Sequence, residues 1–253
     1  IMERKGSIEN IMNASRTEIL GRIRRSLDGL NRQQGSNRHS RFDSSKSLFA
    51  SDFVDLSKIA QRFKAESDRV GSETEICRNI GSAFQFIKSL IRDSDYNNIA
   101  VSNHKICVDN QIIQKLSVDL PEITFFNEYN QTGDHLHRSS NTHRLAQADL
   151  SITGADCLIA DSGTIILTSN PKASRQISLL PTAHLALASI NQIYPNLSTA
   201  LEYLQSTWTH DRHPTAITLI TGPSRTADIE KVLIKGAHGP VRQLALLIDD
   251  EIS

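Results

Sequence analysis

The chain has 253 residues, of which 38% are hydrophobic and 22% charged, and its formal net charge is zero. This composition is typical of a water-soluble globular protein, and the charge balance gives the molecule no electrostatic preference for nucleic acid or a membrane surface. No stretch approaches the roughly 18 consecutive apolar residues of a membrane span, and the N-terminus lacks the apolar core of a signal peptide.

The first predicted element is a basic helix near the N-terminus. Ser15 and Glu18 form a capping box, and apolar residues follow at helical spacing up to Leu30. Its arginines suit docking on the chain's own domain or on an acidic partner. Because Met12 precedes this signal, we expect residues 1–11 to be an upstream extension without a role in the fold.

A change in composition predicts the domain boundary. Residues 31–47 are polar, rich in Ser and Asn and almost without apolar side chains, which is typical of a flexible linker. We therefore expect an N-terminal helix with its linker, residues 1–47, followed by one domain, residues 48–253.

Helices and strands alternate in the first half of this domain. A second capping box, from Ser72 to Glu75, predicts the start of a helix whose apolar stripe runs from Ile76 to Ile91. Two short apolar runs separated by a helical segment indicate a βαβ unit and a parallel sheet. In chain order, the pattern predicts a helix at 53–63, the helix that starts at the capping box of Ser72, a strand at 98–102, a helix at 111–116, a strand at 123–126, a loop at 127–141 and a helix at 142–148.

The second half is richer in strands. Apolar runs at 157–160 and 164–168 are joined by Asp161, Ser162 and Gly163, which predicts a hairpin with a left-handed glycine. The fold class is therefore α/β with an antiparallel hairpin added to the sheet. Further strands are predicted at 183–188, 216–220 and 244–248, with a helix at 195–204.

Several common site motifs are missing from the sequence. There is no Gly-x-Gly-x-x-Gly and no Walker A sequence, so these two modes of nucleotide binding have no support. The cysteines Cys77, Cys107 and Cys157 are far apart and form no Cys-x-x-Cys, so we expect them to be buried, without a cluster or a zinc ion. His135, His137 and His143 lack a firm ligand spacing, and we predict no metal site.

The segment after the strand at 216–220 carries the strongest local signal for a site. Gly222 lets the backbone approach a ligand, Ser224 and Thr226 offer hydroxyls, and Arg225 can form a bidentate pair with a carboxylate or phosphate. An apolar run, Ile229, Val232 and Leu233, predicts a helix directly after it. The alternative is helix capping, in which Asp228 and Glu230 complement the helix dipole and Arg225 makes an internal ion pair. The residue pattern leaves both readings open.

Three stretches resemble a known family. "ITGADCLIADSGTIILTSN" (152–170), "RQISLLPTAH" (175–184) and "GPSRTADIEKVLIKGAHGP" (222–240) are similar, in order and spacing, to the LUD-domain family, specifically its lactate utilization protein C (LutC or YkgG) members. The resemblance implies a fold like that of the NagB/RpiA/CoA-transferase superfamily. It also implies a bacterial, cytoplasmic role in oxidising L-lactate to pyruvate, together with iron–sulfur partner proteins (LutA-like and LutB-like). The clusters are expected in those partners, and no cofactor is expected in this chain.

The resemblance also places site residues on these motifs. The hairpin reads Asp161-Ser-Gly-Thr164, where the family often has Glu-Thr-Gly-Thr, so the acid is one methylene shorter. The site is expected to bind a small anionic substrate through Arg225, with Arg175 as a second candidate. The expected catalytic residues are Asp161, Arg225 and His238, and the expected ligand-binding residues are Asp156, Gly163, Thr164, Arg175, His184, Gly222, Ser224, Thr226, Asp228 and Glu230.

Two other functions stay open at this point. A stand-alone CoA-transferase-like or folate cyclo-ligase-like enzyme is one; a transferase of that type would need a glutamate nucleophile in an exposed turn, where this chain has only Asp161. An assembly factor that acts through the basic helix at 15–32, without catalysis, is the other. Whether the chain is catalytic, and whether it forms a homo-oligomer, the sequence leaves undecided.

Overall fold

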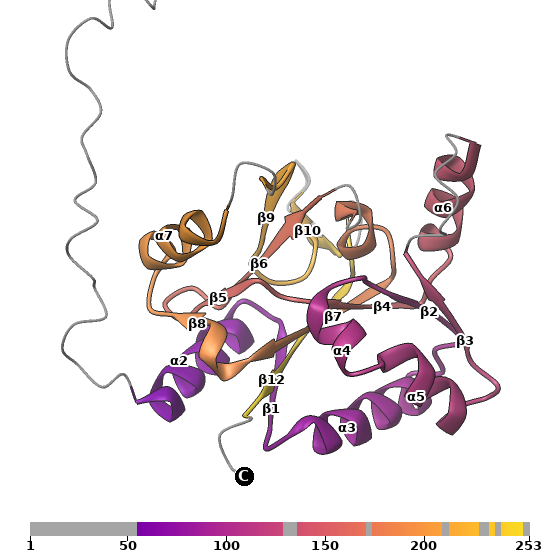
Figure 1. The fold of residues 1–253 in the computed structure, drawn as a ribbon, viewed down its shortest axis with the longest axis horizontal. Helices are drawn as coiled ribbons and strands as arrows, with labels where there is room; N and C mark the ends of the chain where they lie inside the picture. The colour runs from indigo at the N-terminus through magenta and orange to yellow at the C-terminus, as the bar shows by residue number, and fades with distance from the viewer. Residues whose placement is uncertain are drawn as a thin grey trace, which may run out of the picture. The chain divides into compact units, whose positions relative to one another are not determined.

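A six-stranded parallel sheet forms the centre of the protein (Figure 1). The computed structural model describes residues 55–128, 136–170, 174–208, 213–227, 233–235 and 239–249. The strand order is β1-β12-β7-β4-β2-β3, and every neighbouring pair is parallel. The strands are β1 (Glu73–Cys77), β2 (Asn98–Val101), β3 (Thr124–Asn127), β4 (Leu150–Gly154), β7 (Ala183–Ser189) and β12 (Arg242–Ile248).

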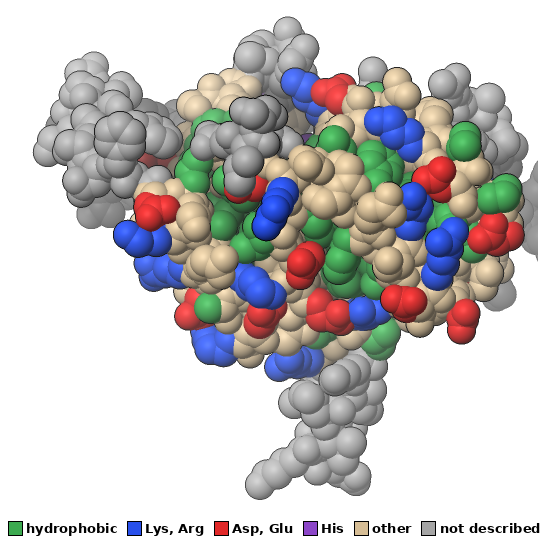
Figure 2. Space-filling view, turned by 90° about the horizontal axis from the view of Figure 1, so that it is seen from below, with side chains coloured by type: hydrophobic (Ala, Val, Ile, Leu, Met, Phe, Trp, Pro, Cys, Tyr) green, Lys and Arg blue, Asp and Glu red, His purple; other side chains and the backbone are tan. Residues whose placement is uncertain are grey.

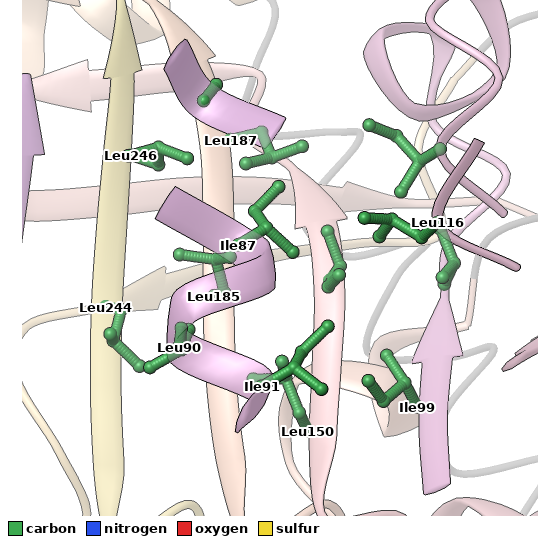
Figure 3. Close-up of a cluster of buried hydrophobic side chains, with 14 of the residues drawn as sticks. Ile87, Leu90, Ile91, Ile99, Leu116, Leu150, Leu185, Leu187, Leu244 and Leu246 are labelled. Carbon is green, nitrogen blue, oxygen red and sulfur yellow. The ribbon is translucent and has the colours of Figure 1, made fainter. Parts of the chain in front are cut away.

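Both faces of this sheet are covered, which explains why its central strands are almost continuously apolar. On one face, α3 (Ile80–Asp93) presents Ile87, Leu90 and Ile91 to Leu185 and to its neighbours on the other strands (Figure 3). The helices α4 (Lys105–Asp109) and α5 (Ile112–Asp119) follow β2, and Leu116 of α5 joins the same cluster.

The other face packs against α2 (Leu56–Arg69) and a second, four-stranded sheet. Side chains alternate on the second sheet, because Leu158 joins the cluster of α2 and the parallel sheet whereas Cys157 and Ile159 pack with α7 (Leu197–Thr207). The strand order is β8-β5-β6-β9, with bounds Ile193–Tyr194, Cys157–Ile159, Thr164–Ser169 and Ala216–Ile220. The remaining elements are α6 (Leu136–Ala146), the 3-10 turns η1 (Arg175–Ser178) and η2 (Ile190–Gln192), and the hairpin β10 (Arg225–Ala227) with β11 (Leu233–Lys235).

The structure confirms the α/β class and the added antiparallel hairpin. β5 and β6 pair antiparallel, and Gly163 at their turn has a φ of 61°. The strands predicted at 98–102, 123–126, 183–188, 216–220 and 244–248 are β2, β3, β7, β9 and β12. The predicted helix at 15–30 lies outside the described residues, and the division into 1–47 and 48–253 stays a prediction.

Two predicted helix starts are wrong. Residues 73–77 form β1 rather than the first turn of a helix, because they pair with β12 along the edge of the sheet. The helix starts at Ile80, where Asn79 and Ser82 make the real capping box. Arg225 and Leu233, which were expected at the start of a helix and within it, lie in the paired strands β10 and β11, and residues 228–232 lie outside the described residues.

The surface agrees with the balanced composition. Figure 2 shows one face, on which Lys and Arg side chains are interspersed with Asp and Glu and no large area carries a single sign. Among the described residues, no helix is both long enough and apolar enough to cross a membrane.

Candidate functional site

The order of the parallel strands marks one place at the sheet's carboxyl edge. β2 and β4 are neighbours in the parallel sheet. The next strand of this sheet after β2 in the chain is β3, on the far side of β2, whereas the next after β4 is β7, on the far side of β4. Open α/β sheets bind ligands at such a switch point, outside the carboxyl ends of the strands. The residues that follow β2 and β4 are therefore the first candidates for a site.

His104 and Asp156 face each other at this point. The Nε2 atom of His104 is 3.7 Å from Oδ1 of Asp156, and the two side chains are 26% and 23% exposed. Oδ2 of Asp156 accepts a hydrogen bond of 2.6 Å from the N–H of Thr168. Solvent thus reaches both groups, and the gap between them is longer than a direct hydrogen bond.

A second contact fixes the tautomer of the imidazole. Nδ1 of His104 accepts a hydrogen bond of 3.3 Å from the N–H of Ile106 and caps α4. Because Nδ1 acts as the acceptor, the neutral ring carries its proton on Nε2, toward Asp156. The ring lies on the end of β4, where a Cβ on Gly154 would come within 1.8 Å of Nδ1. Only glycine at 154 leaves room for the imidazole in this position.

Glu128 follows β3 at the same edge and is fully buried. Its Oε1 accepts from the N–H of Asn103 at 3.1 Å, and its Oε2 accepts from the N–H of Ser174 at 3.0 Å. Burial raises the pKa of Glu128 to about 7, although the two backbone donors and His104 act in the opposite direction. The carboxyl group therefore ties the segment after β2 to the segment that leads into η1. We call His104, Glu128 and Asp156 the switch-point cluster.

The segment predicted to bind an anion lies elsewhere, at the C-terminal end of α2. A Cβ on Gly163 would come within 2.3 Å of the Ser67 backbone nitrogen, and a Cβ on Gly222 within 2.6 Å of the Val70 carbonyl oxygen. Both glycines have positive φ, 61° and 86°, so each turn needs glycine for conformation as well as space. The turns are joined by a hydrogen bond of 2.7 Å between the hydroxyls of Thr164 and Thr221. We call residues 161–164 and 221–225 the anion corner.

The guanidinium of Arg225 is exposed at this corner and lies over Gly71, whose Cβ would come within 2.0 Å of a terminal nitrogen. No described carboxylate forms an ion pair with Arg225. Three buried hydroxyls on α2, on β1 and on the turn between them have no hydrogen-bond partner among the described residues, namely those of Ser67, Ser72 and Thr74. The corner thus offers an exposed cation that no described acid neutralises.

The structure separates the predicted site residues. Asp156 belongs to the switch-point cluster and Asp161 to the anion corner, at opposite ends of β5, with roughly 13 Å of extended chain between Asp156 and Ala160. Arg175 is exposed and follows Ser174, which contacts Glu128. Gly163, Thr164, Gly222, Ser224 and Arg225 share the anion corner, Thr226 has its backbone in β10, and Asp228, Glu230 and His238 lie outside the described residues.

His184 lies inside the core, away from both places. The ring is fully buried, with Nε2 2.8 Å from the hydroxyl of Thr153 and Nδ1 2.9 Å from Oε1 of Gln243. Burial lowers its pKa to about 4. The imidazole links β4, β7 and β12, and a ligand contact at His184 stays a prediction.

Sequence reasoning missed His104 and Glu128. Both directly follow strands that it predicted, so a search for polar residues at the carboxyl ends of those strands could have found them. In the described part of the chain, no group of three or more His, Cys, Asp or Glu side chains could hold a metal ion. Cys77, Cys107 and Cys157 are buried free thiols.

Comparison with known proteins places the chain in a family. Over 118 residues it is 36% identical to "Lactate utilization protein C" of Halalkalibacterium halodurans, which covers 46% of this chain and 51% of that protein. A protein of the same name from Bacillus subtilis is 36% identical over 111 residues, 44% of this chain and 46% of that protein. The chain thus spans about half the length of the curated relatives that it matches.

A solved structure shares the fold. The crystal structure of a DUF162 family protein from Deinococcus radiodurans superposes with a TM-score of 0.53 at 18% identity, over 77% of this chain and 99% of that one. The LUD domain matches residues 60–248, which include both the switch-point cluster and the anion corner. The chain therefore belongs to the LUD domain family.

Proposed function

We propose that this protein takes part in lactate utilization, as a subunit of a bacterial system that oxidises L-lactate to pyruvate. The observation that carries the proposal is the LUD domain match over residues 60–248, together with curated relatives named lactate utilization protein C. The geometry is compatible with this role, because two clusters of polar side chains lie at the surface of one α/β domain, each suited to a small polar molecule.

The electron-carrying groups are proposed to lie in partner proteins with iron–sulfur clusters. The three cysteines of this chain are buried at separate places on β1, α4 and β5. Burial raises the pKa of Cys107 and of Cys157 to about 12, which keeps both thiols protonated and unsuited to ligation. Affinity purification of the tagged protein from lactate-grown cells should therefore recover iron–sulfur proteins.

Growth and enzyme activity test the proposal directly. A strain without this protein should fail to grow on L-lactate, should grow normally on glucose, and should recover when the wild-type chain is supplied. Extracts of the deletion strain should lose L-lactate oxidation and regain it when the purified chain is added. Normal growth of the deletion strain on L-lactate, with undiminished oxidation in its extracts, would contradict the proposed function.

We also propose that the anion corner binds a small anion through Arg225, as a second requirement of the system. The exposed guanidinium, which forms no ion pair with a described carboxylate, supports this. Arg225→Ala should abolish lactate-dependent growth while the melting temperature stays near that of the wild type. Arg92→Ala, at an exposed arginine of α3, is the matched control. Full growth of the Arg225 variant, or loss of growth explained by unfolding, would argue against the corner.

A further inference from the structure

The switch-point cluster has an unused donor and an unused acceptor side by side. Nδ1 of His104 is occupied by the N–H of Ile106, which leaves Nε2–H as a donor. Asp156 uses Oδ2 for the N–H of Thr168, which leaves Oδ1 as an acceptor. The two free atoms are 3.7 Å apart, so an oxygen atom can lie about 2.8 Å from both.

A hydroxyl group matches this arrangement better than a carboxylate or an amine does. Its oxygen can accept from Nε2–H of His104 while its proton is donated to Oδ1 of Asp156. A carboxylate would place negative charge against Asp156, and an ammonium group would meet the Nε2–H donor. The cluster therefore selects a molecule by its hydroxyl.

Glu128 ties the segment before Arg175 to the segment before His104. Its two oxygens accept hydrogen bonds from the backbones of Asn103 and Ser174, which directly precede His104 and Arg175 in the chain. The side chain of Arg175 is exposed, and a guanidinium can form a bidentate pair with a carboxylate. A ligand that combines a hydroxyl with a nearby carboxylate would use all of these groups.

We infer that the switch-point cluster binds a small α-hydroxy acid, with its hydroxyl between His104 and Asp156 and its carboxylate at Arg175. This assignment rests on the proposed function, since L-lactate is the α-hydroxy acid of that system. The anion corner lies at the other end of β5, too far for so small a molecule to touch both places. The corner then serves a different anion.

The chain offers closely matched variants for a binding test. His104→Asn keeps an acceptor that can cap α4, since Asn is among the preferred capping residues, and removes the Nε2 donor. Asp156→Asn removes the acceptor, and Asp93→Asn is the same substitution at an exposed aspartate of α3, outside both candidate sites. His213→Gln changes an exposed histidine outside the cluster.

Binding of L-lactate to the full-length protein is measured by calorimetry and by NMR chemical shifts, with propionate as the ligand that lacks the hydroxyl. We expect His104→Asn and Asp156→Asn to raise the Kd for L-lactate by roughly tenfold to hundredfold. Asp93→Asn and His213→Gln should leave it unchanged, and propionate should bind more weakly than L-lactate. Circular dichroism and thermal melts of each variant show whether the fold is kept.

Three results would overturn the assignment. They are an unchanged Kd in both cluster variants, an equal rise of the Kd in Asp93→Asn, and the absence of L-lactate binding to the wild type at millimolar concentration. None of these decides the proposed function, which rests on growth and on lactate oxidation in extracts. If a strain needs this protein to grow on lactate but His104→Asn does not change the Kd for L-lactate, the proposed function stands and the proposed site is rejected.

Discussion

Two buried titratable groups predict opposite effects of pH on stability. Burial raises the pKa of Glu128 from 4.5 to about 7, and it lowers the pKa of His184 from 6.5 to about 4. A shift of this size corresponds to about 3 kcal/mol of differential stability for each group. Substituting one group at a time should therefore reveal a dependence of stability on pH that the two opposite effects mask in the wild type.

The sign for Glu128 follows from which state holds the proton. Between pH 4.5 and 7 the unfolded chain releases the proton while the folded chain keeps it, so the folded state becomes less favoured as the pH rises. The stabilisation from neutral Glu128 is complete below pH 4.5 and is lost through pH 7. For His184 the unfolded chain gains a proton below pH 6.5 and the folded chain does not, so stability is lost as the pH falls toward 4.

The two windows overlap between pH 4.5 and 6.5, where the contributions of Glu128 and His184 nearly cancel. Glu128→Gln removes the first contribution and keeps a neutral side chain of the same size. As the pH rises from 4.5 to 8, the free energy of unfolding of this variant should increase by about 3 kcal/mol relative to that of the wild type. His184→Gln should show the opposite trend: its free energy of unfolding should increase relative to that of the wild type as the pH falls from 6.5 to 4.

Urea unfolding at a series of pH values measures these differences. Fluorescence of Trp208, the single tryptophan, and circular dichroism report on the same transition, and coincident curves support a two-state treatment. Glu122→Gln, at an exposed glutamate before β3, is the control and should stay within about 0.5 kcal/mol of the wild type at every pH. A constant difference between Glu128→Gln and the wild type from pH 4.5 to 8 would refute the reasoning.

Three further substitutions test local features. Gly154→Ala should push the imidazole of His104 off the end of β4 and weaken L-lactate binding about tenfold in a titration, whereas Gly81→Ala in α3 should not. Gly163→Ala should lower the free energy of unfolding by about 2 kcal/mol or more, because its φ is 61° and a Cβ would meet the backbone of Ser67; a stable variant in urea unfolding would contradict this packing. Asn79→Ala should cost about 1 kcal/mol through loss of the α3 cap, and an unchanged urea midpoint would count against the cap.

Most strands of the parallel sheet were predictable because parallel strands buried on both faces appear as short apolar runs bounded by polar residues, but no strand was predicted at β4 (Leu150–Gly154). Such runs occur in β2, β7 and β12, and these three strands are almost completely buried. β1 was not predictable in the same way. Ser72 and Glu75 satisfy the local pattern of a capping box, but pairing with β12 along five residues outweighs that preference.

β10 illustrates the same limit. Three apolar residues at helical spacing, Ile229, Val232 and Leu233, are too few to distinguish a helix from a strand. The pairing of Arg225 with Lys235 places the arginine in a hairpin, so the anion corner depends on its guanidinium rather than on a helix terminus. The residue type was informative, whereas the element around it was not.

The switch-point cluster could not be assembled from the sequence, because the order of parallel strands leaves no local signal. His104 follows β2 and Asp156 follows β4, with β3 between them in the chain, and they meet because β4 pairs with β2 on the side away from β3. Asp156 and Asp161 lie at opposite ends of β5, so the two acids do not form a pair. What the sheet order adds is the partner that Asp156 has instead. That partner, His104, uses Nδ1 to cap α4, the helix that starts the crossover to β3. Capping of α4 therefore also determines that the imidazole carries its proton on Nε2, toward Asp156.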